Sequence, residues 1–202
     1  MNLDNQNLEW KICEAYFSIL EKSMISEVTL DQLFIVTKIA KAELEKILPN
    51  KTVDYRFFFL KILISKLDRE VLAELKADIA DDTVSNTYDK ILEGLSLRFE
   101  KYAEYKQSLK ILSNNSKERI EVFFNIFQEN QNFFDNLLSL IEGEQNCGIK
   151  AIKSLALNLV FIRGLKVFLK NEGKDIDTVV RHLDKYLGDM QDIGFFIGVL
   201  KK

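Results

Sequence analysis

Histidine, cysteine and proline are almost missing from this chain, which has one His, two Cys and one Pro in 202 residues. A His-dependent catalytic triad would have to be built around His182, and no glycine-rich phosphate loop accompanies it. Cys13 and Cys147 lie far apart in the sequence, and neither has a second Cys or a His at metal-ligand spacing. We therefore expect a protein without catalytic activity, metal or cofactor, whose two thiols are reduced.

Glycine is also scarce, with eight residues in the chain, so few positions force a helix to stop. Apolar residues recur at the three- and four-residue spacing of amphipathic helices. We predict an all-α fold with a break over residues 78–85. The expected helices cover 8–21, two short segments within 28–51, then 52–77, 86–101, 104–112, 117–141, 149–170 and 177–188.

A long uninterrupted apolar run is missing too. The most apolar region, residues 151–169, is interrupted by Lys153, Arg163 and Lys166 and is too polar to span a bilayer. The opening text MNLDNQNLEW lacks the basic region and apolar run of a secretory signal. The net charge of −3 argues against general affinity for nucleic acids or membranes, although it leaves room for a local basic patch. We expect a cytoplasmic protein.

The stretch from Val28 to Lys51, VTLDQLFIVTKIAKAELEKILPNK, predicts two short helices joined by a tight turn. Thr29 can cap the first helix through its hydroxyl, and Gln32, three residues on, can complete a capping box. Leu33 and Val36 then fall on one face of this helix. The stretch has the outline of a helix-turn-helix.

The second helix of this stretch is expected to begin near Ala40 and to end at Pro49, which cannot continue the hydrogen-bond ladder. Its sequence separates into two faces at helical spacing. The inward face holds Leu44, Ile47 and Leu48, and the outward face holds Lys41, Ala42, Glu45 and Lys46.

Together with Ile12, Ala15 and Leu20 of the preceding helix, this stretch resembles the DNA-binding segment of the TetR family. The usual family text is close to S-K-G-T-L-Y-R-Y-F-P-S-K, where this chain has A-K-A-E-L-E-K-I-L-P-N-K. A looser, collinear likeness to a group of alphaproteobacterial TetR-type regulators covers residues 88–112 and 160–187. The resemblance therefore extends over most of the chain.

The resemblance implies a TetR-like architecture with a helix-turn-helix head over residues 1–51 and a ligand-binding and dimerisation body over 52–202. It implies a transcriptional regulator that binds double-stranded DNA as a homodimer. The two copies would associate through their last two long helices, at about 149–188. A small apolar effector would then alter the spacing of the heads. The implied DNA-binding residues are Thr29, Lys38, Lys41, Ala42, Lys46 and Lys51. The pocket candidates, which ordinary core packing would explain equally, are Phe58, Phe59, Phe123 and Phe127.

Several residues of the head favour a second interpretation. The turn carries Thr37 and Lys38 where the family has Ala-Gly, and Glu43 and Glu45 bring negative charge to the face that would meet DNA. Residues 1–51 contain six Lys against eight Asp or Glu. The alternative is a TetR-fold protein that has lost DNA binding and acts as a lipid-binding or scaffold accessory protein, as the TetR-like accessory proteins of ubiquinone biosynthesis do. The apolar tail at 194–200 fits that alternative.

Overall fold

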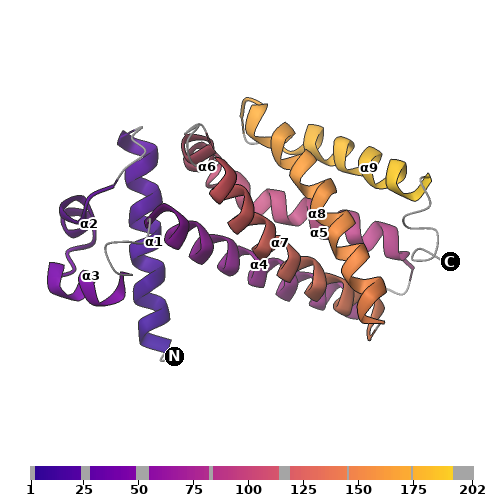
Figure 1. Cartoon of the computed structure of the whole chain (residues 1–202), viewed down its shortest axis with the longest axis horizontal. Helices are drawn as coiled ribbons and strands as arrows, with labels where there is room; N and C mark the ends of the chain where they lie inside the picture. The colour runs from indigo at the N-terminus through magenta and orange to yellow at the C-terminus, as the bar shows by residue number, and fades with distance from the viewer. Residues whose placement is uncertain are drawn as a thin grey trace. The chain divides into compact units, whose positions relative to one another are not determined.

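The computed structural model describes residues 3–23, 28–48, 55–81, 84–113, 119–144, 146–173 and 175–192. Throughout these ranges the regular structure is α-helical, which confirms the predicted all-α fold (Figure 1). No helix among them is long and apolar enough to cross a membrane. The helices are α1 (Leu3–Ser23), α2 (Leu30–Thr37), α3 (Lys41–Ile47), α4 (Tyr55–Asp81), α5 (Thr87–Ala103), α6 (Lys106–Ser113), α7 (Arg119–Glu142), α8 (Cys147–Lys170) and α9 (Asp177–Asp192).

Most helix positions follow the sequence pattern closely, because local signals set them. Asn86 caps α5 by accepting a hydrogen bond from the Asp89 amide at 3.0 Å. The break was expected at residues 78–85, but α4 continues to Asp81, so the predicted break begins before the helix ends. Ile79 is half-buried and extends the stripe of the buried Leu75 by one turn, so the helix gains from continuing.

The chain packs as two compact units. Unit 1 comprises residues 1–66 and 105–126, and unit 2 comprises 67–104 and 127–202. The division therefore falls within α4 and α7, and it differs from the head and body expected from the sequence, which stay a prediction.

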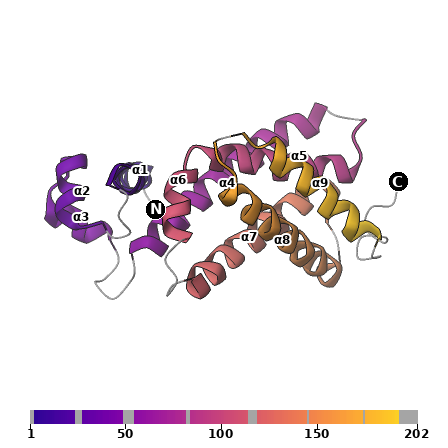
Figure 2. The same cartoon turned by 90° about the horizontal axis from the view of Figure 1, so that it is seen from above.

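In unit 1, α1 lies between the α2–α3 pair on one side and α6 on the other (Figures 1 and 2). Tyr16 of α1 stacks on Phe59 with the ring centroids 4.4 Å apart. The Phe17 carbonyl accepts a hydrogen bond from Ser108 of α6 at 3.1 Å. Burial raises the pKa of the Cys13 thiol, which donates to the Phe59 carbonyl, so this cysteine is an unreactive core residue.

In unit 2, α9 packs against α8 and α5 (Figure 1). Phe99 of α5 stacks on Phe161 of α8, with the ring centroids 5.0 Å apart. Gly164 lets these helices approach, because a Cβ there would come within 2.7 Å of Leu183 Cδ2 and 3.2 Å of the Phe99 ring. A side chain at position 164 would therefore require the buried Leu183 and Phe99 side chains to move.

Candidate nucleic-acid interface and buried polar cluster

The start of α2 is fixed by the predicted capping box. The Thr29 hydroxyl accepts from the Gln32 amide at 3.3 Å, and the Gln32 side chain accepts from the Thr29 amide at 2.8 Å. Two amides that a helix start would otherwise leave unmet are thereby satisfied. Thr29 is exposed, as a residue that approaches a phosphate must be, but its hydroxyl is already engaged in the cap.

The turn between α2 and α3 is held by Thr37. Its buried hydroxyl donates to the Leu33 carbonyl at 2.7 Å and accepts from the Ile39 amide at 3.2 Å. Lys38 follows with φ 60° and ψ 18°, the one positive-φ residue other than glycine in the described chain. A side chain in this left-handed conformation costs about 1 kcal/mol, and glycine avoids that cost. The left-handed residue of the turn is thus Lys38, the position at which the sequence departs from the glycine of the TetR segment.

The outward face of α3 carries as many negative as positive side chains. Leu44 and Leu48 are buried, whereas Lys41, Ala42 and Lys46 are exposed as predicted. Glu43 and Glu45 are exposed on the same short helix. In addition, the Lys41 ammonium forms an ion pair with Asp31 of α2. The positive charge of Lys41 is therefore partly neutralised by Asp31, and the exposed Glu43 and Glu45 offset the charges of both lysines on this helix.

The remaining candidates of the head differ in what the structure describes. Lys38 is exposed at the turn, beside the two helices. Lys51 and Pro49 lie outside the described residues. The helix α3 ends at Ile47, and the amide of its capping residue Leu48 donates to the Leu44 carbonyl at 2.9 Å.

Three consecutive apolar side chains of α2 are exposed. Phe34, Ile35 and Val36 are 41%, 60% and 51% exposed. Leu33 and Val36, expected on one face of this helix, differ in burial, because Leu33 is 0% exposed and Val36 is 51% exposed. The buried residues of α2 are Leu33 and Thr37, which lie four residues apart on one face of the helix. Adjacent exposed apolar side chains such as Phe34, Ile35 and Val36 are typical of a surface that contacts another molecule.

The phenylalanine candidates do not gather in one described site. Phe59 is fully buried in unit 1 between Tyr16 and Phe58, whose ring meets it edge-on at 5.2 Å. Phe127 is half-buried and belongs to unit 2. The side chain of Phe123 lies outside the described part of the chain. The phenylalanine-lined pocket stays a prediction.

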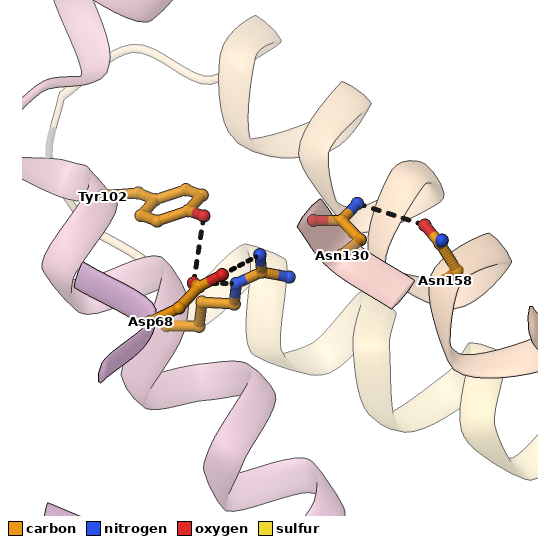
Figure 3. A network of polar contacts seen from close by, with 5 residues as sticks. Asp68, Tyr102, Asn130 and Asn158 are labelled. Atoms are coloured by element: carbon orange, nitrogen blue, oxygen red, sulfur yellow. Dashed lines mark hydrogen bonds and ion pairs between the residues drawn. The ribbon is translucent and has the colours of Figure 1, made fainter. Parts of the chain in front are cut away.

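Sequence reasoning missed a buried ion pair in unit 2. Arg98 of α5 is 0% exposed, and its Nε and Nη2 donate to the two carboxylate oxygens of Asp68 of α4 at 2.7 and 2.8 Å. Tyr102 donates to the same carboxylate at 3.3 Å (Figure 3). The guanidinium carbon lies 4.2 Å from the ring centroids of both Phe133 and Phe161. Burial raises the pKa of the Asp68 carboxyl, and the Arg98 charge opposes that rise.

Two buried asparagines link α7 to α8 beside this pair. Asn158 donates to the Phe127 carbonyl at 2.9 Å and accepts from Asn130 Nδ2 at 3.1 Å (Figure 3). Gln131 and Ser154 add a further bond between the same helices at 2.7 Å. Within the described part of the chain, Asn130 Oδ1 and Arg98 Nη1 are buried polar atoms without a hydrogen-bond partner.

A signal for this cluster is present in the sequence. Arg98 lies three residues after Leu95 and four before Tyr102, so it occupies the apolar stripe of its helix. A charge on such a stripe is buried only with a partner. The sequence does not say which carboxylate provides it, because Asp68 lies 30 residues away.

One face of α8 is apolar and exposed. Ile149, Ile152, Leu155 and Leu159 are 42–53% exposed, whereas the opposite face, with Leu157 and Phe161, is fully buried. Within the described chain, α8 is therefore covered on one face and exposes apolar side chains on the other.

Comparisons with known proteins add no relative. The chain matches no family model, no curated protein and no solved structure. The likeness to the TetR family therefore rests on the residues quoted above and on the helices that they form.

We expect Lys38→Gly to stabilise the protein by up to about 1 kcal/mol, because glycine adopts the left-handed conformation without the Cβ clash. Lys38→Ala is the matched control, since it removes the same charge and keeps the Cβ. Chemical denaturation of the three proteins measures the effect. Equal stability of the glycine and alanine variants would contradict the strained turn.

Asp68→Asn should destabilise the protein by about 3–5 kcal/mol, because it leaves the Arg98 charge buried without its counter-charge. The double variant Asp68→Leu with Arg98→Met should recover most of this loss. Glu74→Gln is the control, because Glu74 pairs with Lys101 between the same two helices at the surface, where such a pair contributes less than about 1 kcal/mol. Chemical denaturation decides. The buried pair is not the constraint if Asp68→Asn and Glu74→Gln have equal effects.

Proposed function

We propose that this chain is a TetR-like transcriptional regulator that binds double-stranded DNA as a homodimer and responds to a small effector. The observation that supports DNA binding best is the α2–α3 pair, whose capped start and tight turn hold a short second helix with its outward side chains exposed. A second helix presented in this way is the element that enters the major groove in helix-turn-helix proteins. Lys41 and Lys46 on this helix would contact phosphates or guanines.

The homodimer is supported by the exposed face of α8. Ile152, Leu155 and Leu159 follow one another at alternating spacings of three and four residues, as in the seam of a helical bundle. The face would be self-complementary about a two-fold axis, so that one surface on each copy suffices. Two copies joined in this way would present two heads to one operator.

The proposal is tested by titrating the purified protein with duplex DNA from its own upstream region and with random duplex, at two salt concentrations. Specific binding should weaken steeply with salt. In the double variant Lys41→Ala with Lys46→Ala, the slope of log K against log salt should fall by about 2, since each phosphate contact contributes about 0.9. Removal of two exposed lysines elsewhere, Lys76→Ala with Lys185→Ala, is the charge-matched control. Absence of binding at low salt would end the DNA-binding proposal.

The dimer is tested separately. Leu155→Glu places a charge within the proposed seam and should convert the dimer into a monomer. Light scattering measures this at protein concentrations where the parent is dimeric. Val84→Glu, at a side chain that is 91% exposed, adds the same charge outside the seam and should leave the dimer intact. A parent protein that is monomeric at high concentration, or a Leu155→Glu variant that stays dimeric, would refute this interface.

A second candidate function is favoured by the exposed apolar side chains of α2. Phe34, Ile35 and Val36 form a surface suited to another protein or a lipid, and the compensated charges of α3 weaken the case for DNA beside it. A protein that is dimeric but fails to bind DNA in the titration would fit this lipid-binding or scaffold role.

A further inference from the structure

An ion pair joins the first turns of the two helices of the α2–α3 pair. The Lys41 ammonium at the start of α3 contacts the Asp31 carboxylate in the first turn of α2. Both side chains stay accessible, at 54% and 70% exposure. An exposed pair of this kind contributes less than about 1 kcal/mol to stability, so the fold does not depend on it. Both charges are instead available to an outside partner.

The backbone that carries the pair is held in a fixed arrangement. The capping box sets the start of α2, and the Thr37 hydroxyl bonds to both sides of the turn that leads to α3. Leu33 of α2 and Leu44 of α3 are both 0% exposed, so each helix is anchored by a buried side chain. The two charges would therefore meet a partner from a preorganised scaffold, and little conformational freedom would be lost on binding.

The pair lies at the end of α3 that would enter the groove. In helix-turn-helix proteins the N-terminal residues of the second helix contact base edges in the major groove. Lys41 is the first residue of α3, whereas Lys46 lies in its last turn, so Lys41 is the lysine placed to reach a base. The ion pair brings the Asp31 carboxylate to the same point.

The two charges together match one edge of a G·C base pair. In the major groove guanine presents two neighbouring acceptors, O6 and N7, and cytosine presents the N4 amino donor beside them. A lysine ammonium donates to the guanine atoms, and an aspartate carboxylate accepts from cytosine N4. An A·T pair offers the lysine one acceptor fewer, because adenine has an amino group where guanine has O6.

A phosphate is a poorer partner for this pair than a base edge. The Asp31 carboxylate would lie close to a phosphate that Lys41 contacted, and the two negative charges would repel each other. The exposed Glu43 adds a further negative charge two residues after Lys41. The pair therefore favours an edge that offers acceptors and a donor side by side.

We propose that Lys41 and Asp31 together recognise one G·C base pair, with the Lys41 ammonium donating to guanine O6 and N7 and the Asp31 carboxylate accepting from cytosine N4. This rests on the proposed function, since it assigns the base pair that the α2–α3 pair recognises in an operator. It makes Asp31, whose charge repels phosphate, a specificity-determining residue.

The test selects bound duplexes from a random DNA library with the full chain and then modifies each G·C position of a selected duplex in turn. N4-methylcytosine replaces the amino hydrogen that faces the major groove by a methyl group, so it removes the donor for Asp31. At one position it should weaken binding about tenfold, the factor that one direct base contact contributes. Inosine in place of guanine keeps O6 and N7 and should leave the affinity at that position unchanged.

Variants assign the contact. Asp31→Ala removes the acceptor, so N4-methylcytosine at that position should no longer weaken binding. Glu43→Ala is the matched control, because it removes one exposed negative charge from the same helix pair, and residues two apart on a helix do not face each other. This control should keep the tenfold effect. An Asp31→Ala protein that keeps the effect, or a parent protein that shows it at no position, would overturn the proposal.

This proposal and the proposed function fail in different ways. Specific, salt-dependent DNA binding that N4-methylcytosine never weakens retains the regulator function and removes the recognition of a G·C pair by Lys41 and Asp31. Absence of DNA binding at low salt removes both.

Discussion

The buried ion pair between Asp68 and Arg98 is the constraint around which unit 2 is arranged. It joins α4 to α5, and the rings that flank the guanidinium come from α7 and α8. A buried pair of this kind adds little net stability over an apolar replacement, but every arrangement that separates the two charges is strongly disfavoured. Shifting any one of the four helices would leave the cation without its carboxylate or without its rings. The pair therefore defines which packing of these helices is acceptable.

The two units expose surfaces of different character. Unit 1 presents a compensated set of charges on α3 beside exposed apolar side chains of α2, and unit 2 presents an apolar face on α8. If unit 1 binds DNA as proposed, its long-range attraction to DNA would be weak, and recognition would depend on short-range contacts once the helix lies in the groove. In the proposed dimer, two such weak contacts on one operator would act through their effective concentration.

What the sequence predicts well is local. The capping box of Thr29 and Gln32 depends on neighbours within four residues, and the structure has it. The positive φ of Lys38 is equally local, and it lies at the turn where the sequence departs from glycine. The helix α4 extends further than expected, because a half-buried Ile79 outweighs an acidic segment. The exposure of Val36 and the partner of Arg98 were not predictable, since each depends on packing between segments that are distant in the sequence. A polar residue on an apolar stripe indicates that it has a buried partner, but it does not identify which residue that partner is.

The hydrogen bonds of Asn158 and Asn130 run in one direction, from amide nitrogen to the next oxygen, beginning at the Phe127 carbonyl. Neither amide can turn over alone, because each would then set oxygen against oxygen or nitrogen against nitrogen. The chain of amides thus has a polarity anchored in the backbone of α7, and it delivers a lone pair at its far end. Within the described chain no hydrogen-bond donor meets that lone pair, so the direction of both amides is set from the α7 backbone alone.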